Sequence, residues 1–140
     1  MILLCTDNRS DVLGELQRGR ALGLGVVYPL SIGRRYWVAG LLIWESTLSV
    51  VLNGDDGSPA TAPAGFFEQL PVRMPDDWSF VVGPGIGMSG SKLWENPLVA
   101  MWGYRELVED RGHLDALLDG DPEACGVFYS RMAAEDLPAE

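Results

Sequence analysis

Histidine and cysteine are the residue types this sequence has least of. Its 140 residues include one histidine, His113, and two cysteines, Cys5 and Cys125. A structural zinc site needs four nitrogen or sulfur ligands, so these residues cannot complete one, and we expect no metal and no cofactor. Two cysteines at opposite ends of the chain are not the framework of a disulfide-rich secreted domain. We expect two buried thiols in a reducing cytoplasm.

Positive charge is also scarce, with 10 Lys and Arg against 20 Asp and Glu and a net charge of −10. Nucleic acids and anionic membranes bind proteins through basic side chains, so we expect neither as a partner. The longest apolar stretch, Trp37–Leu52, is 16 residues long and contains Glu45, which is too short and too polar for a membrane span. The chain also starts without the basic and long apolar segments of a signal peptide. These features predict a cytoplasmic protein.

The length and the hydrophobic content of 47% predict one folded domain over residues 1–140. Its charge is uneven. Residues 1–75 carry six Arg and seven Asp or Glu, whereas residues 76–140 carry four Lys or Arg and thirteen Asp or Glu. The excess negative charge therefore belongs to the second half, which becomes the candidate working surface.

The first half, residues 1–82, is predicted to be rich in strands. Short runs of β-branched and aromatic residues predict strands at Ile2–Cys5, Gly25–Ile32, Tyr36–Trp44, Leu48–Leu52 and Asp77–Val82. Ser10 and the apolar spacing after it predict a helix to about Gly19. A concentrated turn signal lies at Asn53–Pro59.

Residues 98–135 are predicted to be helical. We expect a helix from Trp102 to about Asp110, an interruption at Gly112, and a second helical pattern from Leu114 to Asp119. Asp121, Pro122 and Glu123 form a strong helix start, because Asp caps, Pro suits the first position and an acid favours the positive end of the dipole. The last helix should bury Cys125, Phe128 and Met132. The fold class is α+β, with a small SH3-like β-barrel or a bent antiparallel sheet followed by C-terminal helices.

The Gly-rich segment 83–92 resembles a phosphate-binding loop, since Gly85, Gly87 and Gly90 match the spacing of a dinucleotide fingerprint. The fingerprint also needs a long helix and then a parallel strand. Pro97 closes off a long helix, and no strand-like run follows Asp110. A flexible Gly-rich loop is the simpler interpretation.

Other candidate sites also have simpler explanations. His113 and Cys125 lack a third residue that would orient a nucleophile pair, so we expect His113 at the surface or capping a helix. Asp119–Glu123 departs from a calcium loop at the glycine and glutamate positions and is better explained by helix capping. The pairs Asp55–Asp56 and Asp76–Asp77 lie in turns, where Asp is favoured.

Tryptophan is abundant, with five in the chain. Trp37, Trp44 and Trp78 fall in predicted strands and are expected in the core. Trp94 and Trp102 flank the Gly-rich segment. They pack the helical half on the sheet or serve as anchors for a protein partner, because tryptophan is frequent at interface hot spots.

Several segments, taken in order, resemble small bacterial proteins found beside secreted-toxin genes and regarded as immunity proteins. They are Tyr28–Ile32, Pro63–Glu68, Pro75–Phe80, Leu107–Ala124 and Val127–Phe128, within residues 25–130. The resemblance implies an SH3-like barrel followed by helices, with no catalytic residues. The segment 83–92 and the first 24 residues depart from the pattern.

These observations lead us to expect an immunity-type protein, not an enzyme, that occludes the active site of a cognate toxin domain. Toxins that act on nucleic acid are basic, so an acidic partner would be steered to them. The expected partner-binding residues are Glu106, Glu109, Asp110, Asp115 and Asp119, with Trp102 or Tyr104 as an anchor. Two alternatives stay open, a nucleotide- or ligand-binding domain that uses residues 83–92 and an acidic DNA mimic. The sequence does not indicate the oligomeric state.

Overall fold

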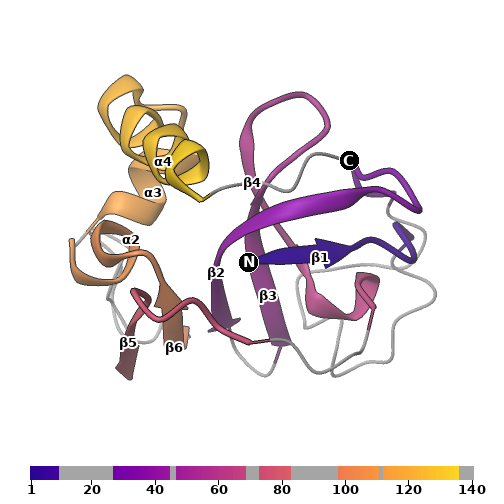
Figure 1. Cartoon of the computed structure of the whole chain (residues 1–140), viewed down its shortest axis with the longest axis horizontal. Coiled ribbons are helices and arrows are strands. Elements are labelled where there is room, and N and C mark those ends of the chain that lie inside the picture. Colours follow the sequence, from indigo (N-terminus) through magenta and orange to yellow (C-terminus); the bar gives the residue numbers. More distant parts are fainter. Residues whose placement is uncertain (10–26, 45–46, 69–72, 83–97, 111, 136–140) are drawn as a thin grey trace.

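The computed structural model describes residues 1–9, 27–44, 47–68, 73–82, 98–110 and 112–135. Within these residues the chain forms a six-stranded sheet and a group of helices (Figure 1). The strands are β1 (Ile2–Leu4), β2 (Arg35–Trp44), β3 (Thr47–Asn53), β4 (Pro59–Pro63), β5 (Ser79–Val82) and β6 (Leu98–Gly103). The helices are the 3-10 turn η2 (Ala64–Phe66) and the α-helices α2 (Arg105–Glu109), α3 (His113–Leu118) and α4 (Pro122–Ala134).

The sheet is antiparallel, and its strand order is β4-β3-β2-β6-β5, with β1 paired to β2 outside this path. β2 is long and bent, with a register shift between Val38 and Gly40. β1 pairs with its first residues and β6 with its last ones, so both lie on the same side of β2. The predicted α+β class and bent sheet are therefore confirmed. The sheet in the described part of the chain is not closed, so an SH3-like barrel is not confirmed.

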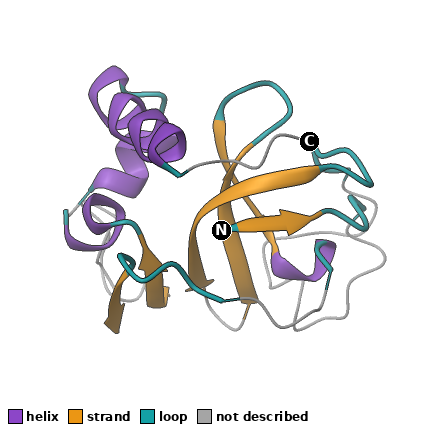
Figure 2. Cartoon of the chain, viewed as in Figure 1, coloured by secondary structure: helices purple, strands orange, loops and turns teal. Residues whose placement is uncertain are grey.

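Two cores lie on the two sides of this bent sheet. One joins Trp37, Leu42 and Met101 of the strands to Leu107 of α2 and Phe128 of α4. The other gathers around Val38, Val50 and Phe66 at the opposite end of the molecule, where η2 is drawn apart from the other helices (Figure 2). Alternate residues of the strands point to opposite faces, which is why one sheet can supply both cores.

Two facing glycines allow helix α2 to lie directly on the sheet. Gly40 of β2 is opposite Gly103 of β6. A Cβ atom at Gly40 would lie 2.5 Å from Cδ2 of Leu107 and 2.6 Å from the carbonyl oxygen of Trp102. The absent side chains therefore make the space that Leu107 fills.

The predicted helix from Trp102 is wrong at its start, because Leu98–Gly103 is strand β6 and α2 begins at Arg105. β6 lies between β2 and β5 and is hydrogen-bonded on both sides. Its apolar residues are typical of such an inner strand. A short, continuous apolar run shows no hydrophobic periodicity, however, so its sequence does not distinguish a buried strand from a buried helix. Residues 98–135 therefore begin with a strand and are not wholly helical.

The helix predictions after Gly112 agree with the structure. Gly112 separates α2 from α3 with a φ of 86°, in the left-handed region that favours glycine. The Asp121 carboxylate accepts a hydrogen bond of 3.0 Å from the Ala124 amide, and Pro122 opens α4. Of the three residues predicted to be buried by α4, Phe128 is fully buried, whereas Cys125 and Met132 are partly buried.

Some strand predictions also need correction. β1, β2, β3 and β5 confirm four of the predicted strands, and the turn at Asn53–Pro59 connects β3 to β4. The part of Gly25–Ile32 that is described, from residue 27, forms an isolated bridge at Val27 and then a loop. Trp37 is buried, but Trp78 precedes β5 and, like Trp44, is only partly buried. The helix predicted from Ser10, the Gly-rich segment and Trp94 lie outside the described residues.

Candidate functional site

Tyr104 and His113 form a buried pair rather than part of a surface. Tyr104 is 3% exposed and follows β6, so it is not the exposed anchor that its sequence position predicts. Its hydroxyl lies 2.6 Å from Nε2 of His113. His113 is 9% exposed at the start of α3, which overturns the prediction of a surface or capping histidine. Burial raises the pKa of Tyr104 and lowers the pKa of His113, and the second effect is partly offset by nearby carboxylates such as Asp110.

Glu106 forms an ion pair with Arg131 of the same chain. The Arg131 guanidinium of α4 donates to both carboxylate oxygens of Glu106 in α2, and the Oε2 contact is 2.8 Å. Burial acts to raise the pKa of Glu106, but the hydrogen bond and charge of Arg131 outweigh it and lower that pKa. Glu106 therefore ties α2 to α4, and its charge is neutralised within the molecule.

Glu109 and Asp110 lie at the end of α2, beside the beginning of β5. The Ser79 hydroxyl donates a hydrogen bond of 3.0 Å to Oε2 of Glu109, and Arg105 lies 3.6 Å from the same oxygen. These side chains are exposed, so the ion pair contributes little to stability. Asp110 is also exposed and forms no ion pair with a described residue. Two of the predicted acids thus lie next to the edge strand.

Trp102 lies on β6, the strand adjacent to β5. Its ring stacks on Phe80, with 4.6 Å between the ring centroids and 26° between the planes. Phe80 is 53% exposed and pairs with Trp102 across the two strands. The alternation in Asp77–Val82 predicts a strand but does not decide which of its residues face solvent, so sequence reasoning missed Phe80. Trp102 and Glu109 thus contact β5 from opposite faces, Trp102 through Phe80 and Glu109 through Ser79.

Asp115 and Asp119 belong to α3, away from β5: Asp115 is half-buried in the first turn of the helix, and Asp119 lies at the connection between α3 and α4. Asp119 ends α3 and is exposed, and the neighbouring Leu118 is 41% exposed. Asp121 and Glu123 follow at the start of α4. The seven predicted partner-binding residues are thus divided between two surfaces and the buried contacts of Glu106 and Tyr104.

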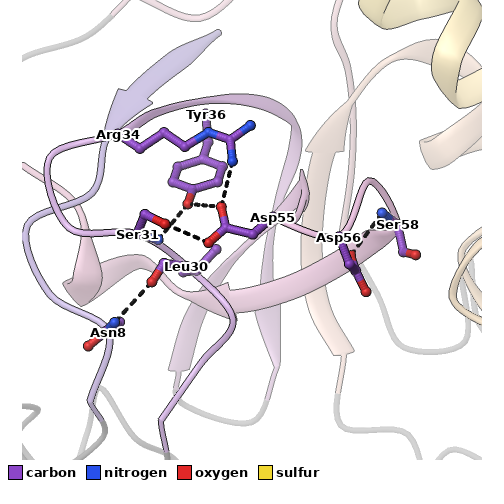
Figure 3. Close-up of polar contacts among 8 residues, drawn as sticks. All are labelled: Asn8, Leu30, Ser31, Arg34, Tyr36, Asp55, Asp56 and Ser58. Atoms are coloured by element: carbon purple, nitrogen blue, oxygen red, sulfur yellow. Dashed lines mark hydrogen bonds and ion pairs between the residues drawn. The ribbon is translucent and has the colours of Figure 1, made fainter.

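A polar cluster in the strand-rich half was not expected from the sequence (Figure 3). The Asp55 carboxylate, in the β3–β4 hairpin, accepts from Nη1 of Arg34 at 2.7 Å, the Ser31 hydroxyl at 2.7 Å and the Tyr36 hydroxyl at 2.5 Å. The Tyr36 hydroxyl accepts in turn from the Ser31 amide at 2.6 Å. Burial acts to raise the pKa of Asp55, but the bonds from Tyr36 and Ser31 and the charge of Arg34 outweigh it and lower that pKa.

The cluster connects the loop before β2 to the hairpin. Asp56 behaves as the turn composition predicts, since its carboxylate accepts from the Ser58 amide at 3.0 Å. Asp55 does not form a local turn contact of this kind, because its side-chain partners lie about twenty residues earlier in the chain. The Tyr129 hydroxyl of α4 donates to the Gly57 carbonyl of the same hairpin. The polar side chains of the cluster form hydrogen bonds with one another, so the cluster has a structural role, which is to hold the hairpin against the segment around the start of β2.

Metal and membrane features are absent from the part of the chain that the structure describes. Its His, Cys, Asp and Glu residues do not group in sets of three or more suited to a metal ion. None of its helices has the length and hydropathy to cross a membrane. Comparison with protein-family models, with curated proteins and with solved structures finds no match.

Proposed function

We propose that this protein is an immunity-type inhibitor that acts in the cytoplasm and neutralises a basic toxin domain by covering its active site. The inhibitor needs no catalytic residue and no cofactor, because occlusion is sufficient. The observation that carries the proposal is the unbalanced charge of α2, α3 and α4. Among their described residues and connections, seven acids stand against two arginines, and both arginines are in intramolecular ion pairs.

Four of the other acids lie at the surface. Asp110, Asp119, Asp121 and Glu123 are exposed, and none forms an ion pair with a described basic residue. Their field extends into the solvent and attracts a basic protein before contact, which raises the association rate. A toxin that acts on nucleic acid has a basic active-site cleft, so the same attraction directs the inhibitor to the cleft.

Co-expression with the toxin domain encoded by the neighbouring gene tests the proposal. The chain should restore growth of cells that produce the toxin, and the two proteins should co-purify in moderate salt. The double variant Asp119→Lys, Glu123→Lys should bind more slowly. The variant Glu68→Lys is the control, because it reverses an exposed charge in the strand-rich half, away from the α-helices and from β5.

Three results would contradict the proposal or replace it. A neighbouring gene that encodes no toxin, or growth that is not restored, would end it. Binding to several unrelated basic proteins, lost in moderate salt, would indicate a DNA mimic instead.

A further inference from the structure

The open face of the sheet at β5 and β6 carries apolar side chains that no helix in the described part of the chain covers. Val81 of β5 points to the other face and packs in the core with Leu107 and Val108 of α2. Phe80 and Val82 alternate with Val81, so they point away from the helices, and they are 53% and 68% exposed. In Figure 1, β5 and β6 lie below the helices at one end of the molecule.

The pairing register extends this apolar face across four strands. Two cross-strand rows follow from it: Phe80, Trp102, Leu41 and Val50, and Val82, Ala100, Ile43 and Leu48. Phe80 and Val82 of β5 are the most exposed members, Leu48 of β3 is 44% exposed, and Val50 and Ala100 are buried. The apolar contact area is therefore concentrated at the edge of the sheet, where Phe80 stacks on Trp102.

Carboxylates surround the beginning of the same edge strand. Glu109 is bonded to Ser79, the first residue of β5, and Asp110 follows it. Asp76 and Asp77 are exposed in the turn that leads into the strand. Asp76 pairs with Arg73, but both side chains are more than 80% exposed, so the pair is weak. Ser79 alternates with Phe80, so Glu109 lies on the helix side of β5 and the aromatic pair lies on the other side. An extended segment along this edge, with side chains that alternate between the two faces, meets apolar side chains on one face and a carboxylate on the other.

We propose that this surface, defined by Phe80, Val82, Trp102, Glu109 and the turn before β5, binds an extended basic segment of the toxin domain. The inference rests on the proposed function and specifies its contact surface. β5 ends the strand order of the described sheet, so an extended segment adds to its edge through main-chain hydrogen bonds. Apolar side chains of the segment then meet Phe80 and Val82, and its arginines or lysines meet the carboxylates. A second copy of the chain fits poorly, because each copy carries a net charge of −10.

The first experiment uses a blocked peptide of alternating valine and arginine as the probe, followed by NMR of the labelled full chain. We expect saturable shifts of the β5 amides and of the Trp102 indole below about 1 mM peptide, and none with a valine–glutamate peptide. No shift at that concentration, shifts at the α3–α4 connection instead, or equal response to both peptides would overturn the inference. Self-association that persists without peptide, seen by ultracentrifugation, would identify a second copy as the occupant and overturn it too.

The second experiment measures affinity for the toxin domain with surface variants that should keep the fold. Val82→Thr is nearly isosteric, and Phe80→Thr keeps a residue that favours strands. Leu118→Gln is the matched control, because it removes an exposed apolar side chain from the α3–α4 surface. The β5 variants should weaken binding about tenfold or more and the control less than about twofold.

These outcomes separate the two proposals. Toxin binding that survives both β5 substitutions but is lost in Leu118→Gln would overturn the contact surface and leave the inhibitor function standing. If the peptide bound at β5 but the toxin domain did not bind, the inhibitor function would be overturned. The claim that the surface at β5 binds extended basic segments would remain.

Discussion

At the residue scale, Asp55 has three side-chain partners, although the sequence presents it as an ordinary turn aspartate. Asp55 holds together the loop before β2 and the β3–β4 hairpin through Ser31, Arg34 and Tyr36. Arg34 also lies over the Tyr36 ring, 5.1 Å from its centroid. Tyr36 is the buried member, so its hydroxyl would be costly to leave without partners.

Tyr36→Phe should lower the free energy of unfolding by about 1 kcal/mol, because the hydrogen bonds of its hydroxyl with Asp55 and with the Ser31 amide are lost. Tyr28→Phe is the control: its ring packs edge-on against Phe66, as that of Tyr36 does against Phe67, and its hydroxyl has no hydrogen bond to a described residue. The control should change stability by less than about 0.5 kcal/mol. Urea unfolding measures both. Equal effects in the two variants would show that the cluster adds nothing.

His113 should make stability depend on pH. Burial lowers its pKa below the ordinary 6.5, although Asp110, Glu106 and Asp121 act to raise it. As pH falls through 6.5, the unfolded chain therefore binds a proton that the folded chain does not, and stability is lost. The free energy of unfolding should decrease between pH 7 and 5.5.

His113→Gln should flatten this pH dependence, since it is the only histidine in the chain and glutamine can still bond Tyr104. Urea unfolding of both proteins at several pH values provides the comparison. Parallel profiles for the two proteins would refute the assignment, and NMR titration of the histidine ring gives its pKa directly.

At the element scale, the contact between α2 and the β2–β6 pair determines how the helices sit on the sheet. α2 has five residues and could not be stable alone, so packing must hold it. Leu107 enters the space left by Gly40 and Gly103. The sequence shows both glycines but not that they face each other, because the pairing of β2 with β6 joins residues about sixty positions apart.

Gly40→Ala should therefore destabilise the protein by about 2–3 kcal/mol, since the new methyl group would collide with Leu107 and with the Trp102 carbonyl. Gly126→Ala is the opposite control. It lies inside α4 with nothing within 4 Å of the added atom, so it should stabilise by about 0.5–1 kcal/mol. Thermal unfolding measures both. A tolerated Gly40→Ala would mean that α2 does not pack as described.

At the scale of the whole molecule, charge and contact surface are separate features. Ion pairs neutralise part of the helical charge, as at Glu106 and Arg131, and the N-terminal ammonium pairs with Glu135 at 2.7 Å. The acids left over lie beside β5 and at the α3–α4 connection. The first group borders apolar side chains and suits tight contact, whereas the second suits attraction at a distance.

Salt should therefore slow association with the toxin domain more than it speeds dissociation. Between 0.01 M and 0.1 M salt the Debye length falls from about 30 Å to about 10 Å, so the association rate should drop about tenfold and the dissociation rate change less than about twofold. The variant Asp119→Asn, Glu123→Gln should show a smaller salt effect. Surface plasmon resonance separates the two rates. If salt changed the dissociation rate more than the association rate, the proposed separation between long-range attraction and the contact surface would be contradicted.

The sequence by itself determined the elements whose signals are local. The turn at Asn53–Pro59, the break at Gly112 and the start of α4 at Asp121 depend on residues next to one another, and the structure has them as predicted. The acid excess of the second half is likewise a property of composition. Only the tertiary structure decided which acids stay available, because Glu106 is neutralised by a residue 25 positions later. It also buried Tyr104 and His113 and placed Phe80 on Trp102, since pairing between distant strands chooses the face on which each side chain lies.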